Sequence, residues 1–209
     1  MQVYTYGSTG AWLRKFWSEE EDICFTDLEE ANPIGERVNP KEEFHILVSD
    51  VPLIRTAKEI ETAVLQYGRV FIPIMVDYPF LTIGPLSMQG SEGCFHCYMD
   101  RLFQHDPNVK LTQGVYKHYE EGSNRGPVEI HPADNLLIMN WIELLRENPQ
   151  TAMEQFRGKI SRINLYNRTF VNSKVIGVHG CKLCGEPIEP ESRSYIHMLK
   201  YLNEGVFAE

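Results

Sequence analysis

The sequence predicts an α/β fold of the nucleotide-binding type, and three features of its first half support this. Residues 3–6 form a short β-type segment, and a turn with Gly7 and Gly10 leads from it into apolar residues at helical spacing. A continuous apolar strand follows at 44–49, as in buried parallel sheets. A helix-spaced apolar run then precedes a further strand at 70–76.

The length and composition of the chain fit one globular domain. The chain has 209 residues, of which 43% are hydrophobic and 23% charged, so it can bury a sizeable core. We expect the main domain to span residues 1–190. Residues 191–209 are expected to form a helical tail, because Tyr195, Ile196, Leu199 and Leu202 recur at helical spacing.

Charge and hydropathy exclude several classes of partner. The net charge of −9 has the wrong sign for a protein that binds phosphate backbones, so nucleic acid is not expected as a partner. No apolar run approaches the roughly 20 residues that cross a bilayer, and the N-terminus has no signal-peptide pattern. We therefore expect a cytoplasmic protein without a membrane partner, in a compartment where cysteines stay reduced.

Two Cys-x-x-Cys knuckles hold four of the five cysteines: Cys94 with Cys97, and Cys181 with Cys184. Thiolates are soft ligands, and a closed tetrahedral zinc shell needs both knuckles. The 83 residues between them (98 to 180) would be linked by a structural zinc ion. The alternatives are a thioredoxin-like redox pair, disulfides, or unpaired buried thiols. A catalytic zinc is disfavoured, because four thiolates leave no open coordination position.

The remaining elements of the first half follow in order. A second strand at 23–26 ends at Asp27, which is expected to cap the next turn, and Cys24 is expected to be a small buried hydrophobe. A loop with several Pro and Gly residues is expected at 31–41. The helix after the strand at 44–49 should end at Gly68. Pro73 suggests an edge or a bulge in the strand at 70–76.

The second half is read in the same way. Another strand at 81–86 leads into the first knuckle, which one or two helical turns follow at 98–103. The polar stretch between 105 and 132 is expected to be a long loop, and a helix should span about 133–146. Strands are expected at 160–166 and over 169–178, where the latter delivers the second knuckle.

The glycine turn lacks the G-x-G-x-x-G fingerprint of dinucleotide sites, since it holds only two glycines. We expect a tight turn that binds nothing. A weaker alternative makes Gly7 to Gly10 a phosphate cradle and Asp27 a ribose ligand.

A family resemblance rests on residues 83–101, which contain a Gly84-Pro85 turn, the first knuckle and Arg101, and on residues 158–163 ahead of the second knuckle. With these motifs in this order along the chain, the sequence resembles the ThiF-like, ubiquitin-activating-enzyme superfamily. Within that superfamily it resembles the subunits that partner YcaO proteins in making azole-containing peptides. The first knuckle is similar to that of the zinc-binding subunit of microcin synthetase. The resemblance covers most of residues 1–190. It implies a degenerate Rossmann-like ThiF fold with a four-cysteine zinc staple and, as in its relatives, a homodimer.

The resemblance also implies a function. A YcaO ATP-dependent cyclodehydratase would close azoline or azole rings in a ribosomally made precursor peptide, and this chain would be its non-catalytic scaffold. Active superfamily members adenylate a carboxylate. Of the ATP-site residues of these active members, only Asp50 with Arg55 has a counterpart in this sequence. The stretch between Cys97 and Cys181 contains no cysteine that could act as the nucleophile. The alternative is an active adenylating enzyme that holds phosphate at Gly7 to Gly10 and magnesium at Asp50.

No catalytic residue is predicted. His96 lies between two knuckle ligands and is expected to pack outside the metal shell, and His118, His131 and His179 are not expected to act as general bases. The three tryptophans are expected in the core or a dimer interface: Trp12, Trp17 and Trp141.

Overall fold

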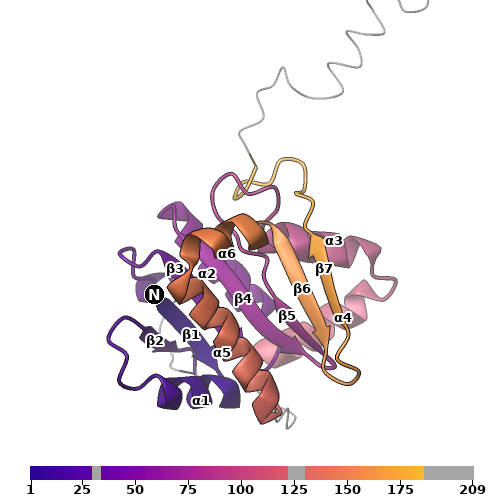
Figure 1. Cartoon of the computed structure of the whole chain (residues 1–209). Coiled ribbons are helices and arrows are strands. Elements are labelled where there is room, and N and C mark those ends of the chain that lie inside the picture. The colour runs from indigo at the N-terminus through magenta and orange to yellow at the C-terminus, as the bar shows by residue number, and fades with distance from the viewer. Residues whose placement is uncertain (30–33, 122–129, 186–209) are drawn as a thin grey trace, which may run out of the picture.

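The structure is a computed structural model of the chain, and it describes residues 1–29, 34–121 and 130–185. A seven-stranded sheet forms the middle layer, with strand order β2-β1-β3-β4-β5-β6-β7 (Figure 1). The strands are β1 (Gln2–Tyr6), β2 (Cys24–Asp27), β3 (Phe44–Ser49), β4 (Val70–Asp77), β5 (Phe80–Ile83), β6 (Lys159–Asn164) and β7 (Phe170–Lys174). The α/β fold that the sequence predicts is confirmed.

The sheet has two halves with different strand directions. Strands β2, β1, β3 and β4 run parallel, with β1 between β2 and β3. From β4 onward, each neighbouring pair is antiparallel. The crossover connections of the parallel half carry helices, as parallel pairing requires. The antiparallel half places the ends of β5 and β7 at the same edge of the sheet, because β6 runs between them in the opposite direction.

Helices cover both faces of the sheet. On one face α1 (Ser8–Phe16), α5 (Pro132–Glu147) and α6 (Pro149–Phe156) pack on the larger hydrophobic cluster, which includes Leu13, Ile46 and Ile142. On the other face α2 (Ile54–Gln66) and α3 (Phe95–His105) share a second cluster with Leu47 and Phe71. The short 3₁₀ helix η1 (Ile34–Arg37) contacts α2, and so does α4 (Val109–Glu120). None of the described helices is long and apolar enough to cross a bilayer.

Four expectations are corrected or refined. The predicted loop between 105 and 132 contains α4, which was not predicted because none of its residues is buried. Helix α6 was not expected. Cys24 is exposed, because β2 is an edge strand. Strand β4 is internal, and Pro73 lies where its pairing passes from Ile83 to Ser87 across the Gly84-Pro85 turn, so the bulge interpretation fits and the edge interpretation is wrong.

Other predictions fall partly outside the described residues. The expected helix at 192–207 and the Gly- and Ser-containing stretch 122–127 lie there. The division at residue 190 stays a prediction.

His45 makes stability depend on pH. Its side chain is fully buried in β3, with Nδ1 3.1 Å from the Tyr4 hydroxyl and Nε2 3.2 Å from the Glu42 carbonyl. Burial lowers the pKa of His45 to about 4, and Arg69 and the N-terminal ammonium lower it further against the opposing effect of Glu42. The unfolded chain, with a pKa near 6.5, therefore binds a proton that the folded chain rejects.

We predict that the free energy of unfolding falls by up to about 3 kcal/mol as the pH drops from about 6.5 to 4, because the proton favours the unfolded state. His45→Gln keeps a donor for the Glu42 carbonyl and should flatten this slope. Urea unfolding at a series of pH values measures it. An equal slope in both proteins would contradict the assignment to His45.

Candidate metal centre

The four predicted ligand sulfurs lie together at the edge of the sheet where β5 and β7 end. Cys94 Sγ is 3.7 Å from the sulfurs of Cys97 and Cys181, and Cys97 Sγ is 3.5 Å from Cys184 Sγ. All four sulfurs are within 4.8 Å of one another, and all four cysteines are free. A tetrahedron of Zn–S bonds of 2.3 Å has edges of about 3.8 Å. The spacing of this sulfur cluster thus fits one zinc ion.

Glycines and backbone hydrogen bonds place the two knuckles. Cys94 is the N-cap of α3 and Cys97 lies in its first turn. A Cβ on Gly93 would come within 2.5 Å of the Val175 carbonyl oxygen, so only glycine allows the two knuckles to approach. The Val178 amide donates to Cys97 Sγ across 3.2 Å, which joins the second knuckle to the first.

The protons of the cluster are strongly coupled. Hydrogen bonding from the Cys94 thiol lowers the pKa of Cys97 to about 4, and the Val178 amide adds to this effect. The same Cys94–Cys97 hydrogen bond, with burial and the nearby Glu61 carboxylate, raises the pKa of Cys94. Burial first, then contact with Cys97, raises the pKa of Cys184 to about 12. Several thiolates can coexist here only beside a cation, which is the condition that a zinc ion meets.

Glu61 supports the first knuckle from behind. This carboxylate on α2 is fully buried, and its Oε1 accepts from the Phe95 amide at 2.7 Å. Its Oε2 accepts from the His96 amide at 3.0 Å and lies 2.6 Å from His96 Nδ1. An acidic group at a helix N-terminus satisfies its free amides and its dipole. Glu61 thereby fixes the first turn of α3, which carries Cys97.

The sequence interpretation did not include Glu61. The available signal was an acidic residue inside an apolar helical stripe, between Ile60 and Val64. His96 packs on Glu61 as a neighbour of the sulfur cluster, in agreement with its expected place outside the metal shell.

The second region of interest lies at the carboxyl ends of β1 and β3, where the helices that follow them, α1 and α2, pack on opposite faces of the sheet. Doubly wound folds bind nucleotides at such a place. Here the Asp50 side chain fills the N-terminus of α1. Its Oδ2 accepts from the Ser8 amide at 2.5 Å and from the Ser8 hydroxyl at 2.7 Å, and the Thr9 amide is 3.2 Å from both oxygens. The chain's own carboxylate thus occupies the position that a phosphate would need.

The two turn glycines serve this packing. Gly7 has a φ of 84°, and a Cβ there would lie 2.5 Å from Asp50 Oδ2. A Cβ on Gly10 would lie 2.5 Å from the Cβ of Thr5. Close packing therefore accounts for both glycines, as expected of a tight turn.

The other acidic candidate is also engaged. Asp27 pairs with Arg14, and its Oδ1 accepts from the Glu29 amide at 3.0 Å, so it caps the turn as predicted. Arg55, the expected companion of Asp50, lies on the exposed side of α2 and pairs with Glu59 at 3.9 Å. The structure does not bring Asp50 and Arg55 together as a pair.

The remaining histidines and tryptophans have structural surroundings. His131 caps α5 by accepting from the Ala133 amide at 3.2 Å, His118 lies beside Tyr119, and His179 lines a cavity at the second knuckle. Trp17 is buried and donates to Glu143 at 2.8 Å. Trp12 and Trp141 pack against the larger hydrophobic cluster, so the prediction of core positions holds.

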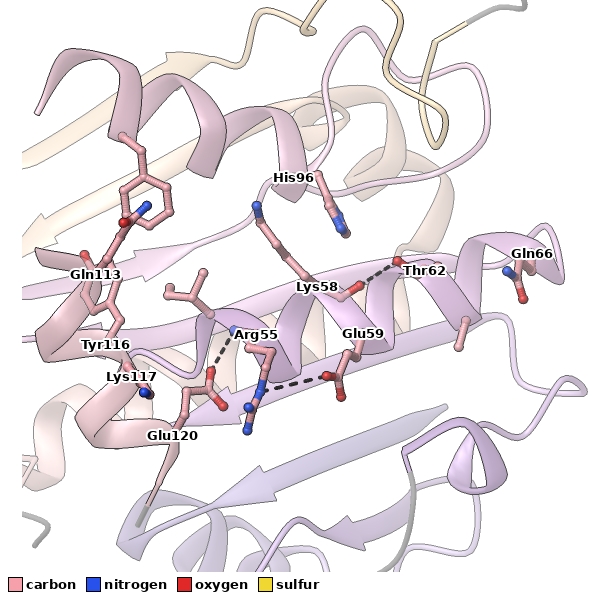
Figure 2. Close-up of a pocket in the computed structure, with 13 residues that line it drawn as sticks. Arg55, Lys58, Glu59, Thr62, Gln66, His96, Gln113, Tyr116, Lys117 and Glu120 are labelled. Carbon is pink, nitrogen blue, oxygen red and sulfur yellow. Dashed lines mark hydrogen bonds and ion pairs between the residues drawn. The ribbon is translucent and has the colours of Figure 1, made fainter. Parts of the chain in front are cut away.

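A groove of about 570 Å³ lies between α2, α3 and α4 (Figure 2). We call it the α2–α4 groove. Ile54, Ala63 and Phe103 give it apolar surface, and Arg55, Lys58 and Lys117 add cations along its wall. The sequence did not predict the groove, because α4 forms one of its sides.

Comparison with known proteins yields a fold but no close relative. No family model matches the chain, and no curated protein sequence does. Solved structures match with high probability. The microcin synthetase McbBCD complex of E. coli has a TM-score of 0.61 at 13% identity, over 86% of this chain and 67% of that one.

Two further structures extend the comparison. A heterocyclase in complex with substrate and cofactor has a TM-score of 0.56 at 17% identity and covers 89% of this chain, which spans only 25% of the heterocyclase. E. coli MccB with ATP has a TM-score of 0.54 at 15% identity, over 82% of this chain and 48% of that one.

The chain shares its fold with part of the heterocyclase and microcin synthetase structures. The predicted Rossmann-like α/β fold, with four cysteines gathered at metal-binding distance, is confirmed.

One prediction from this site concerns the sulfur cluster. Cys181→Ser should lose the bound metal and lower the melting temperature by about 10 °C, because three sulfurs no longer close the shell that joins the two knuckles. Elemental analysis and calorimetry measure both quantities. Cys24→Ser is the matched control, since Cys24 is exposed and outside the cluster. Unchanged metal content and melting in Cys181→Ser would rule out the site.

Another prediction concerns Asp50. Asp50→Asn removes the negative charge from the N-terminus of α1, and with its amide oxygen toward Ser8 it places an NH₂ group against the Thr9 amide. We expect a loss of about 1 to 2 kcal/mol in the free energy of unfolding. Asp22→Asn, which changes an exposed surface pair with Arg146, should cost much less. Equal effects of the two substitutions would show that Asp50 is not a cap.

Proposed function

We propose that this chain is a non-catalytic subunit of a heterocyclase complex, in which it presents a ribosomally made precursor peptide to a YcaO-type ATP-dependent cyclodehydratase. The product would be an azoline- or azole-containing peptide, such as a bacteriocin or a related natural product. The shared fold with heterocyclase and microcin synthetase structures supports this class of role. One observation carries the non-catalytic part: the Asp50 carboxylate occupies the N-terminus of α1, where an adenylating enzyme needs ATP phosphate.

The proposed contribution of the chain is proximity. Binding both the peptide and the cyclodehydratase raises the effective concentration of the core segment at the partner's site. A scaffold of this kind needs rigid geometry and no reactive group of its own. The proposed structural zinc, held by Cys94, Cys97, Cys181 and Cys184, would supply rigidity where β5 and β7 end. When bound, the ion would act as a tetrahedral crosslink with no open position for substrate.

The proposal includes the cytoplasm as location, because thiolate ligands need reducing conditions. It also includes a homodimer, on the resemblance alone.

The second candidate is an active ThiF-like adenylating enzyme that uses ATP and magnesium on a peptide or carrier-protein carboxylate. Its support is the shared fold with MccB, which was solved with ATP. In that case Asp50 would have to leave Ser8 and Thr9 and bind magnesium instead. The negative charge of Asp50 repels phosphate as long as it stays at the helix terminus.

The two candidates predict different outcomes in one reconstitution. The chain should co-purify with a YcaO protein encoded beside it, and the mixture with precursor peptide and ATP should give a mass loss of one water per ring. The chain alone should show no ATP–pyrophosphate exchange and no thermal shift with magnesium-ATP. Exchange by the isolated chain, without a retained partner, would support the adenylating enzyme and contradict the scaffold.

A further inference from the structure

The α2–α4 groove is open because α4 is attached by polar contacts and by two partly buried rings, Tyr116 and Tyr119, with no fully buried apolar side chain. No residue of α4 is buried among the described side chains. Glu120 accepts from the Arg55 amide at 2.7 Å and from the Thr56 hydroxyl at 2.8 Å, and the Tyr116 hydroxyl donates to Asp77 at 2.9 Å. These contacts hold the C-terminal half of α4 at the first turn of α2 and at the end of β4. Beyond them the helices are separated by the groove and its apolar surface, a feature typical of binding sites.

The two ends of the groove differ. Figure 2 shows Tyr116, Lys117 and Glu120 beside Arg55 at one end, and Gln66 at the far end of α2. His96 lies across from Thr62 between these ends. The groove is therefore bounded by α4 at its Arg55 end and lies near α3 and the first knuckle further along.

The last residues that the structure describes lie close to the Thr62 side of the groove. A second cavity, of about 400 Å³, is lined by Thr62, His96, Cys181 and Leu183 and so shares Thr62 and His96 with the groove. The last described residue, Gly185, donates its amide to the Cys181 carbonyl at 3.1 Å. Whatever follows Gly185 thus starts beside this second cavity.

The sequence that follows has the length and pattern of a groove ligand. Residues 186–191 contain two prolines and can span at most about 20 Å. Apolar residues then recur at helical spacing: Tyr195, Ile196, Leu199 and Leu202. A helix over 192–204 would be about 20 Å long, against about 17 Å for the stripe of α2 from Arg55 to Gln66.

We propose that residues 192–207 of the same chain bind in the α2–α4 groove, with the apolar face of Tyr195, Ile196, Leu199 and Leu202 against Ile54, Ala63 and Phe103. This is the helix-in-groove mode of recognition. Entry from the Thr62 side carries Glu204 toward Arg55 and Lys117, which pair with Glu59 and Glu121, so that Glu204 would share these two cations. The short linker keeps the effective concentration in the millimolar range, so that weak contacts suffice for docking.

The docked segment would cover the groove and stabilise α4. Any second peptide or subunit helix that uses the groove must then displace it, which makes the segment a competitor for that site. This inference does not depend on the proposed function.

Hydrogen exchange of the full-length protein tests the proposal. Leu199→Asp places a charge on the apolar face and should release the segment, so that the α4 amides (109–120) exchange about 10-fold faster at unchanged protein stability. His197→Asp is the matched control, because it adds the same single negative charge on the opposite face of the helix and should leave exchange unchanged. A carbodiimide crosslink between Glu204 and Lys117 should form in the wild type and be lost in Leu199→Asp.

Two results would overturn the proposal. One is α4 exchange that is the same in Leu199→Asp and the wild type. The other is a crosslink that forms only between chains, in a mixture of ¹⁵N-labelled and unlabelled protein, since a second copy rather than the chain's own segment would then fill the groove.

Discussion

The convergence of four sulfurs at one edge of the sheet is the constraint on which the rest of the structure depends. Strands β5 and β7 are not direct neighbours, yet their C-terminal ends must lie close enough for Cys94 to meet Cys181 and for Cys97 to meet Cys184. Structural zinc sites are worth about 10 to 16 kcal/mol in small modules, as much as the whole stability of a typical domain. A bound metal would thus fix the antiparallel half of the sheet, where β7 is entirely exposed and contributes little burial.

The N-termini of α1 and α3 show why the fold can persist without nucleotide. Helix N-termini need an anion or a capping group, and a nucleotide-binding relative of this fold can use phosphate. Here Asp50 caps α1 and Glu61 caps α3, both from buried or nearly buried positions. Each carboxylate compensates a helix dipole from within the chain. The fold therefore satisfies its own electrostatics, and a scaffold role requires nothing more at these positions.

The sequence predicts those parts of the molecule in which local pattern and tertiary burial agree. Strand β3 is buried at every position and helix α2 buries one stripe, so both were readable from apolar spacing. The sulfur cluster was predictable from the two Cys-x-x-Cys motifs alone, without any knowledge of the fold. Helix α4 was missed because it buries none of its residues, and the groove was missed with it. Cys24 and Glu61 show the same limit of local pattern. Cys24 is exposed because β2 is an edge strand, and Glu61 is buried because α3 packs on α2; local sequence specifies neither strand order nor helix packing.

X-ray absorption at the zinc edge of the purified protein tests the central claim most directly, because it counts the ligand atoms themselves. The account predicts one zinc per chain with four sulfur neighbours at about 2.3 Å. A spectrum with nitrogen or oxygen ligands in place of any sulfur, or a protein that carries no zinc after purification under reducing conditions, would contradict it.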